Sequence, residues 1–165
     1  MIAKLRVANV KKILLAALFA GGLTLGVPPT TAFAQAPAST PVDGRHAFDF
    51  EIGTWRMHLS RRLKPLTGSD SWVEYEGVSV VRKVWDGKAN LGEIDLDGPA
   101  GHIQGLSLRL YNPATGQWGV SFSNSADGTL GPPMMGGFKD GRGEFYNQEL
   151  FNGRAIFVRF VFSEV

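Results

Sequence analysis

The chain contains no cysteine, which excludes disulfide bonds, thiolate metal sites and cysteine nucleophiles. It also lacks an uninterrupted apolar run of about 20 residues, the length that a helix needs to cross a bilayer. Motifs with a known catalytic mechanism, such as a phosphate loop, a nucleophile elbow or H-E-x-x-H, do not occur in it. The sequence therefore assigns no enzyme class, and the fold has to be stabilised by apolar packing without covalent links.

The N-terminus has the layout of a secretory signal. Four basic residues precede an apolar run over residues 13–27, and Gly and Pro residues interrupt that run before it could span a membrane. Ala32-Phe33-Ala34 then matches the small-x-small cleavage pattern. We predict that residues 1–34 are a signal peptide, cleaved after Ala34, and that the protein is periplasmic or extracellular.

The charge balance depends on the same segment. The chain has 17 Lys and Arg against 15 Asp and Glu, but residues 1–34 hold four of the basic residues and none of the acidic ones. Cleavage would leave a chain near neutrality, which has no strong field to attract nucleic acid or an anionic membrane. We expect neither as a partner. Residues 35–41 are rich in Ala, Pro, Ser and Thr, and residues 35–45 are predicted to be a flexible leader to one domain over residues 46–165.

Short segments rich in Val, Phe, Trp and Leu alternate with turn residues along this domain. The chain has 21 Gly and nine Pro, and this punctuation predicts an all-β fold with about eight strands. Trp55, Met57 and Leu59 alternate with polar residues, so the first strand should bury one face and expose His58 on the other.

Later strands and turns carry more specific predictions. In the last strand, over residues 154–162, both faces are apolar, so it should be covered on both sides. Asp86-Gly87 is expected to form a two-residue hairpin turn, because Gly tolerates positive φ. The leucines of the strand over residues 103–111 alternate, and we expect them on its inner face: Leu106, Leu108 and Leu110.

Several sequence blocks resemble known β-barrel families. Gly53-Thr54-Trp55, after a short helical turn, resembles the G-x-W motif of the calycin superfamily, in which the tryptophan plugs the closed end of the barrel. Longer blocks resemble DUF1579, a bacterial family of unknown function; they are residues 48–55, 107–118, 143–146 and 153–159. The resemblance implies an antiparallel, up-and-down, lipocalin-like β-barrel. Members of that family continue into a further strand and a final hairpin, so it also implies a barrel that is incomplete at the C-terminus. No catalytic residue carries over.

A barrel of this kind predicts non-covalent binding of a small apolar or amphipathic ligand, without a cofactor. We expect the ligand to contact Arg109, Tyr111, Trp118, Phe122 and Trp72. Arg109 could hold a ligand carboxylate through a bidentate contact or serve the structure alone, and the sequence leaves both open. Arg159 is expected to be structural, with Gly53 and Trp55 in the barrel plug, stacked on Trp55 or on another ring.

Two other classes of function remain open. Glu74 and Glu76 are two residues apart on one strand and point to the same side. A barrel enzyme could use them as an interior carboxylate pair for acid–base catalysis. Alternatively, an unpaired sheet edge near residues 157–162 could take a strand from a partner or from a second copy of the chain.

Three acidic residues alternate along the predicted third strand, over residues 91–96, and the position after it. Glu93, Asp95 and Asp97 share one face, and His102 follows across a loop. Their spacing matches no metal-ligand motif, whereas charged residues are common on solvent-facing strands. We therefore expect no metal.

Overall fold

The computed structural model describes residues 3–6 and 44–163. These residues belong to one compact unit, and a second unit, Ala8–Val42, lies outside the described residues. The predicted cleavage site and most of the predicted leader fall in that undescribed part. Among the described residues, no helix has the length and apolar character required to cross a membrane.

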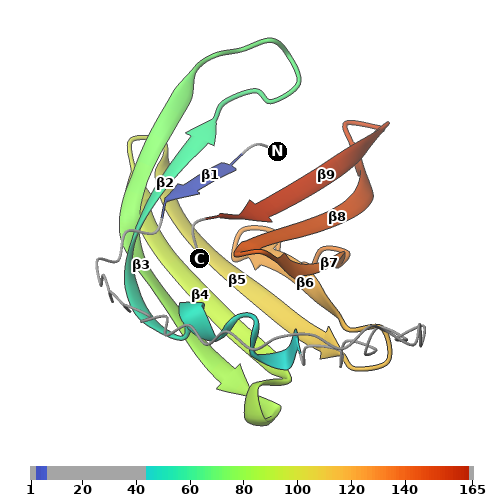
Figure 1. Cartoon of the computed structure of the whole chain (residues 1–165). Coiled ribbons are helices and arrows are strands. Elements are labelled where there is room, and N and C mark those ends of the chain that lie inside the picture. The colour runs from blue at the N-terminus through green and yellow to red at the C-terminus, as the bar shows by residue number, and fades with distance from the viewer. Residues whose placement is uncertain (1–2, 7–43, 164–165) are drawn as a thin grey trace, which may run out of the picture. The chain divides into compact units, whose positions relative to one another are not determined.

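All strands of the described residues form one antiparallel sheet, and each strand pairs with the next one in the chain (Figure 1). The strands are β1 (Ala3–Arg6), β2 (Gly53–Arg62), β3 (Trp72–Val84), β4 (Ala89–Gly98), β5 (Gly101–Asn112), β6 (Gln117–Asn124), β7 (Met134–Lys139), β8 (Arg142–Phe151) and β9 (Arg154–Phe162). Three short 3-10 helices, η1 (Gly44–His46), η2 (Asp49–Glu51) and η3 (Trp85–Gly87), accompany them. The predicted all-β, up-and-down fold is confirmed, and the eight expected strands correspond to β2–β9.

The sheet curls into a half-barrel without closing (Figure 1). Strands β8 and β9 face β2 and β3 across the interior, and no ladder joins β9 to β1 or β2 in the described part of the chain. The predicted incomplete barrel is confirmed. The edge of β2 pairs with β1 from His58 to Arg61. Because β1 belongs to the segment predicted to be a signal peptide, cleavage after Ala34 would expose this edge.

Alternation along β2 separates the concave inner face from the outer face. Met57 packs on that inner face with Tyr75 of β3 and Leu96 of β4 in a buried cluster. Leu59 packs against the same cluster, and His58 is exposed on the outer face. The predicted orientation of this strand is confirmed.

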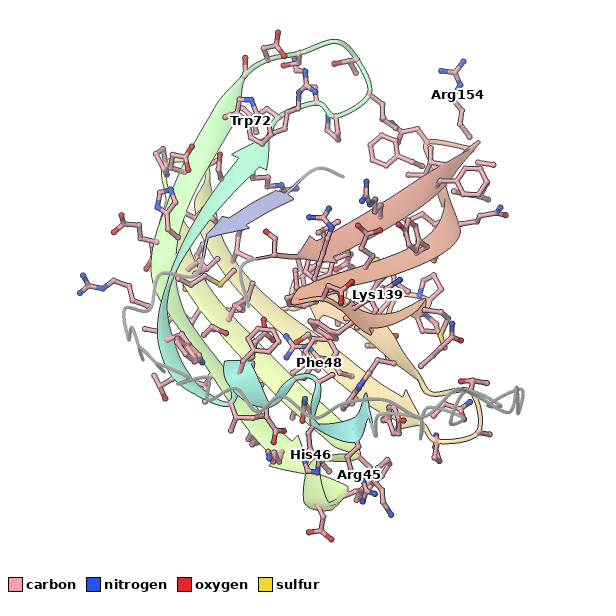
Figure 2. All side chains as sticks on the ribbon, viewed as in Figure 1. Arg45, His46, Phe48, Trp72, Lys139 and Arg154 are labelled. Atoms are coloured by element: carbon pink, nitrogen blue, oxygen red, sulfur yellow. The ribbon has the colours of Figure 1, made fainter. Side chains whose placement is uncertain are left out.

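The segment over residues 44–52 seals one end of the half-barrel. Phe48, between η1 and η2, points inside the curve of the sheet (Figure 2) and is fully buried. Its ring lies 4.9 to 5.6 Å from four others, and together these five residues form the floor cluster: Phe48, Trp118, Phe138, Phe145 and Phe162. The indole of Trp118 donates a hydrogen bond to the carbonyl of Gly44 at 2.7 Å, which fixes the segment across this end.

The inner face of β5 was predicted wrongly. Leu106 and Leu110 lie on the outer face, 36% and 42% exposed, whereas Ser107 and Arg109 point inward and are buried. The residues of β5 do alternate between the two faces, but the face predicted to be inside is outside, and the other face is inside. Arg109 can occupy the interior because Glu51 supplies a counter-ion there, and burial of a charge is tolerated when it is paired.

The expectation that β9 is covered on both faces is also wrong. Its inner residues, Phe160 and Phe162, pack on or within the floor cluster, but Phe157 on the outer face is 83% exposed. No described element packs against that outer face.

The turn after β3 is longer than predicted. Val84 pairs with Ala89, so four residues connect the strands rather than two. Trp85, Asp86 and Gly87 all have positive φ, and η3 replaces the two-residue turn.

Candidate functional site

The concave face above the floor cluster remains partly open. Phe122 of β6 faces the interior yet is 40% exposed, and its ring lies 5.3 Å from that of Phe160 in β9. Strand β6 pairs with β7 only from Trp118 to Val120, so Phe122 lies beyond the paired region. Other half-buried apolar side chains share this face: Leu59, Val73, Ile94, Ile103, Ile156 and Val158. Together they form an apolar surface that a small molecule could cover.

Four of the five residues predicted to contact a ligand lie on this inner face of β5 and β6. The rings of Tyr111 and Trp118 are 5.4 Å apart. Trp118 is fully buried and Tyr111 is half-buried against η1, so both help to build the floor. Trp72 lies apart from them, at the start of β3 (Figure 2), with the guanidinium of Arg62 5.9 Å from its ring. Phe122 is therefore the predicted residue most accessible from the open side.

Arg109 is held by an ion pair below this surface. Its guanidinium contacts the carboxylate of Glu51 and lies 4.8 Å from the centre of the Phe48 ring. Both charged side chains are about nine-tenths buried. Glu51 already neutralises the guanidinium, and Phe48 covers it, so the geometry favours the structural role of Arg109 over a contact with a ligand carboxylate.

Burial shifts the pKa values of both partners. Desolvation raises the pKa of Glu51, and the nearby Arg109 opposes the shift. Desolvation likewise lowers the pKa of Arg109, opposed by Glu51. Sequence reasoning missed Glu51, because nothing in the local pattern of η2 connects it with a residue of β5.

Asn90 of β4 is a second buried polar residue that sequence reasoning missed. It lies opposite Arg109 in the sheet register and is almost fully buried. Neither atom of its side-chain amide has a hydrogen-bond partner in the described part of the chain. Because Asn90 and Arg109 face the same interior, the floor holds a small polar cluster beside its aromatic rings.

The three residues predicted to form the barrel plug are divided between two places. Trp55 donates a hydrogen bond from its indole to the carbonyl of Glu51 at 2.6 Å, next to Gly53, whose φ of 133° favours glycine. Arg159 lies on the outer face of β9, where it binds Glu144 at 2.5 Å with its guanidinium 6.0 Å from the Tyr146 ring. Its aromatic neighbour is therefore Tyr146 instead of Trp55.

Glu144 is the centre of this outer cluster. The Tyr146 hydroxyl, Arg142 and Arg159 all donate hydrogen bonds to it. These contacts lower the pKa of Glu144 to about 2, with the Tyr146 hydrogen bond as the largest cause. The cluster lies on the solvent side of β8 and β9.

Glu74 and Glu76 share one side of β3, as predicted, but that side is the outer face. Both carboxylates are more than half exposed. His58 lies 2.9 Å from Glu74, and Ser60 donates a hydrogen bond to Glu74 at 2.8 Å. The prediction of an interior carboxylate pair is wrong, because the register with β2 places both residues opposite solvent-facing partners.

Asp95, Asp97 and His102 come together on the outer face of β4 and β5. Their ligand atoms lie within 4.8 Å of one another, and all three side chains are exposed. The imidazole of His102 is 2.8 Å from the carboxylate of Asp97, and this hydrogen bond raises the pKa of His102. The arrangement fits the solvent-facing, charged strand that the sequence favoured.

No family model, no curated protein and no solved structure matches this chain. The half-barrel is compatible with ligand binding.

Proposed function

We propose that this is an exported protein that binds a small apolar or amphipathic molecule, non-covalently, on the concave face of the half-barrel. The observation that carries the proposal is the 40% exposure of Phe122 on the inner face, above a sealed floor. Ligand sites are usually concave and mostly apolar, and the half-buried residues around Phe122 have that character. The signal-like N-terminus supports export.

The exposed area of Phe122 limits how much this side chain can contribute to the free energy of ligand binding. An aromatic side chain buries roughly 150 to 250 Å², so a ligand that covered the exposed two-fifths would remove about 80 Å² from water. At about 25 cal/mol per Å², this is worth at most about 2 kcal/mol. Truncation of Phe122 should therefore weaken binding by about fivefold to thirtyfold.

Fluorescence titration with N-phenyl-1-naphthylamine, an uncharged apolar probe, tests the proposal. We expect saturable binding to the full chain and weaker binding to Phe122→Ala. Phe157→Ala is the matched control, because it removes the same ring from the outer face, where Phe157 is 83% exposed. Absence of saturable binding, or equal losses in the two variants, would contradict a concave-face site.

The exposed Phe157 also favours a second candidate, a module that pairs through the free edge of β9. Strand β9 is nine residues long, and the described residues pair it on one side only. Such an edge can take an added strand. Phe157→Pro should abolish self-association measured by sedimentation velocity, because the alternation of hydrogen-bonded pairs points the Phe157 N–H to the free edge and proline removes that donor. A monomer at every concentration would rule out a second copy as the added strand.

A further inference from the structure

A second hollow lies on the outer face of the sheet, on the opposite side from the proposed concave site. It spans β3 to β6, with Gly128 of the β6–β7 connection at its border, and has a volume of about 410 Å³. Small-molecule sites range from about 300 to 1,000 Å³. The side chains that matter for its chemistry are Val78, Val80, Glu93, Asp95, Gln104 and Leu106.

The apolar part of the hollow comes from three residues on two strands. Val78 and Val80 of β3 and Leu106 of β5 are each between 36% and 44% exposed. Glu93 of β4 lies between them, since its Cα is paired with Val80 on one side and with Leu106 on the other. The reversed sense of alternation in β5 is what brings Leu106 to this outer surface.

The polar part of the hollow is acidic. Glu93 has no hydrogen-bond or ion-pair partner among the described residues. Asp95 accepts a hydrogen bond from Gln104 at 3.3 Å and lies 3.6 Å from the imidazole of His102. Within residues 44–163, no Lys or Arg lines the hollow. Arg56 and Arg82 are the nearest basic residues by register, beside Val78 and Leu91, and neither contributes to its lining.

We propose that this hollow binds an amphipathic cation, a primary ammonium group on a short alkyl chain. The alkyl chain would cover Val78, Val80 and Leu106, and the ammonium would lie against Glu93 and Asp95. An ammonium offers three donors and no acceptor, which matches the unpartnered carboxylate of Glu93 and the carboxylate of Asp95, where it would compete with the imidazole of His102. The site is independent of the proposed concave one.

Nuclear magnetic resonance titration of the full chain with n-octylammonium chloride tests this inference, with n-octanol and n-octyl sulfate for comparison. We expect shifts of the Val78, Val80 and Leu106 methyl signals, and tighter binding of the ammonium than of either comparison ligand. Glu93→Gln and Asp95→Asn should each weaken ammonium binding about threefold to fivefold, the upper range for a partly exposed charge pair. Binding should also weaken at high salt, because salt screens such pairs.

Two variants distinguish binding in this hollow from binding elsewhere on the protein. Asp140→Asn is the matched control, because Asp140 lies in the β7–β8 turn with φ of 51°, a conformation that asparagine tolerates; it should leave binding unchanged. Phe122→Ala alters the concave face, and the ammonium-induced shifts of the methyl signals at the hollow should be the same in this variant. The inference would be overturned if these methyl signals did not move, if octanol moved them at the same concentrations as the ammonium, if Glu93→Gln and Asp95→Asn left the ammonium-induced shifts undiminished, or if Phe122→Ala abolished those shifts.

Discussion

Replacement of Arg109 by methionine removes the cationic partner of Glu51 and leaves a carboxylate about nine-tenths buried. Removal of one partner from a buried ion pair destabilises a protein by about 3 to 5 kcal/mol. The contact of the guanidinium with the Phe48 ring, at 4.8 Å, contributes about 0.5 to 2 kcal/mol more. Arg109→Met should therefore lower the free energy of unfolding by about 4 kcal/mol or more, a large part of the roughly 5 to 15 kcal/mol typical of a domain.

The double variant Glu51→Leu/Arg109→Met should recover most of that loss. It replaces both charges with apolar side chains of similar size, and such replacements are often neutral or stabilising. We expect the double variant to lie within about 2 kcal/mol of the unmodified protein.

The loss in Arg109→Met should depend on pH. Burial raises the pKa of Glu51 above its ordinary value of 4.5 in the folded chain. At pH values between the ordinary pKa and the raised one, Glu51 is protonated in the folded state but ionised in the unfolded state. The free energy of unfolding therefore decreases as pH rises through this window. Arg109 opposes the upward shift, so its removal raises the pKa further and extends the window. Arg109→Met should lose less stability at about pH 4 than at about pH 7.5.

Urea unfolding followed by the fluorescence of the four tryptophans measures these effects. Arg159→Met is the matched control, because Arg159 also pairs with a glutamate but is half exposed; it should cost less than about 1 kcal/mol. The reasoning is refuted if Arg109→Met costs no more than this control, or if the double variant is as unstable as the sum of its single changes.

Two further predictions concern the floor and the outer face. Phe48→Ala should lower the free energy of unfolding by about 3 to 5 kcal/mol in the same assay, because it leaves a cavity among four aromatic rings; a loss below about 1 kcal/mol would show that the floor cluster is not packed as described. Asp97→Asn should lower the pKa of His102 towards its ordinary value of 6.5, since the Asp97 hydrogen bond is the main cause of the upward shift. Titration of the imidazole signals by nuclear magnetic resonance measures this, and an unchanged midpoint would contradict the contact.

Strand positions could be predicted from the sequence because the signals that set them are local. The Gly and Pro residues at the turns predicted the number of strands, β2 to β9, and the ranges predicted for β5 and β9 agree with the structure to within two residues. In β2, the alternation of Trp55, Met57 and Leu59 with polar residues also identified the inner face correctly. Phe122, which was predicted to contact a ligand, also lies on the inner face.

Which face of β5 is inside could be decided only by tertiary structure. Alternation defines two faces, and hydrophobicity alone placed the three leucines inward; in the folded chain, Ser107 and Arg109 occupy the interior instead. Arg109 is stable there because Glu51 and Phe48, far away in the sequence, meet it at the floor. The same dependence on distant residues explains why Glu51 was missed and why Glu74 and Glu76 were wrongly placed inside. Local sequence determines the period of a strand, whereas the partners that make burial favourable come from elsewhere in the fold.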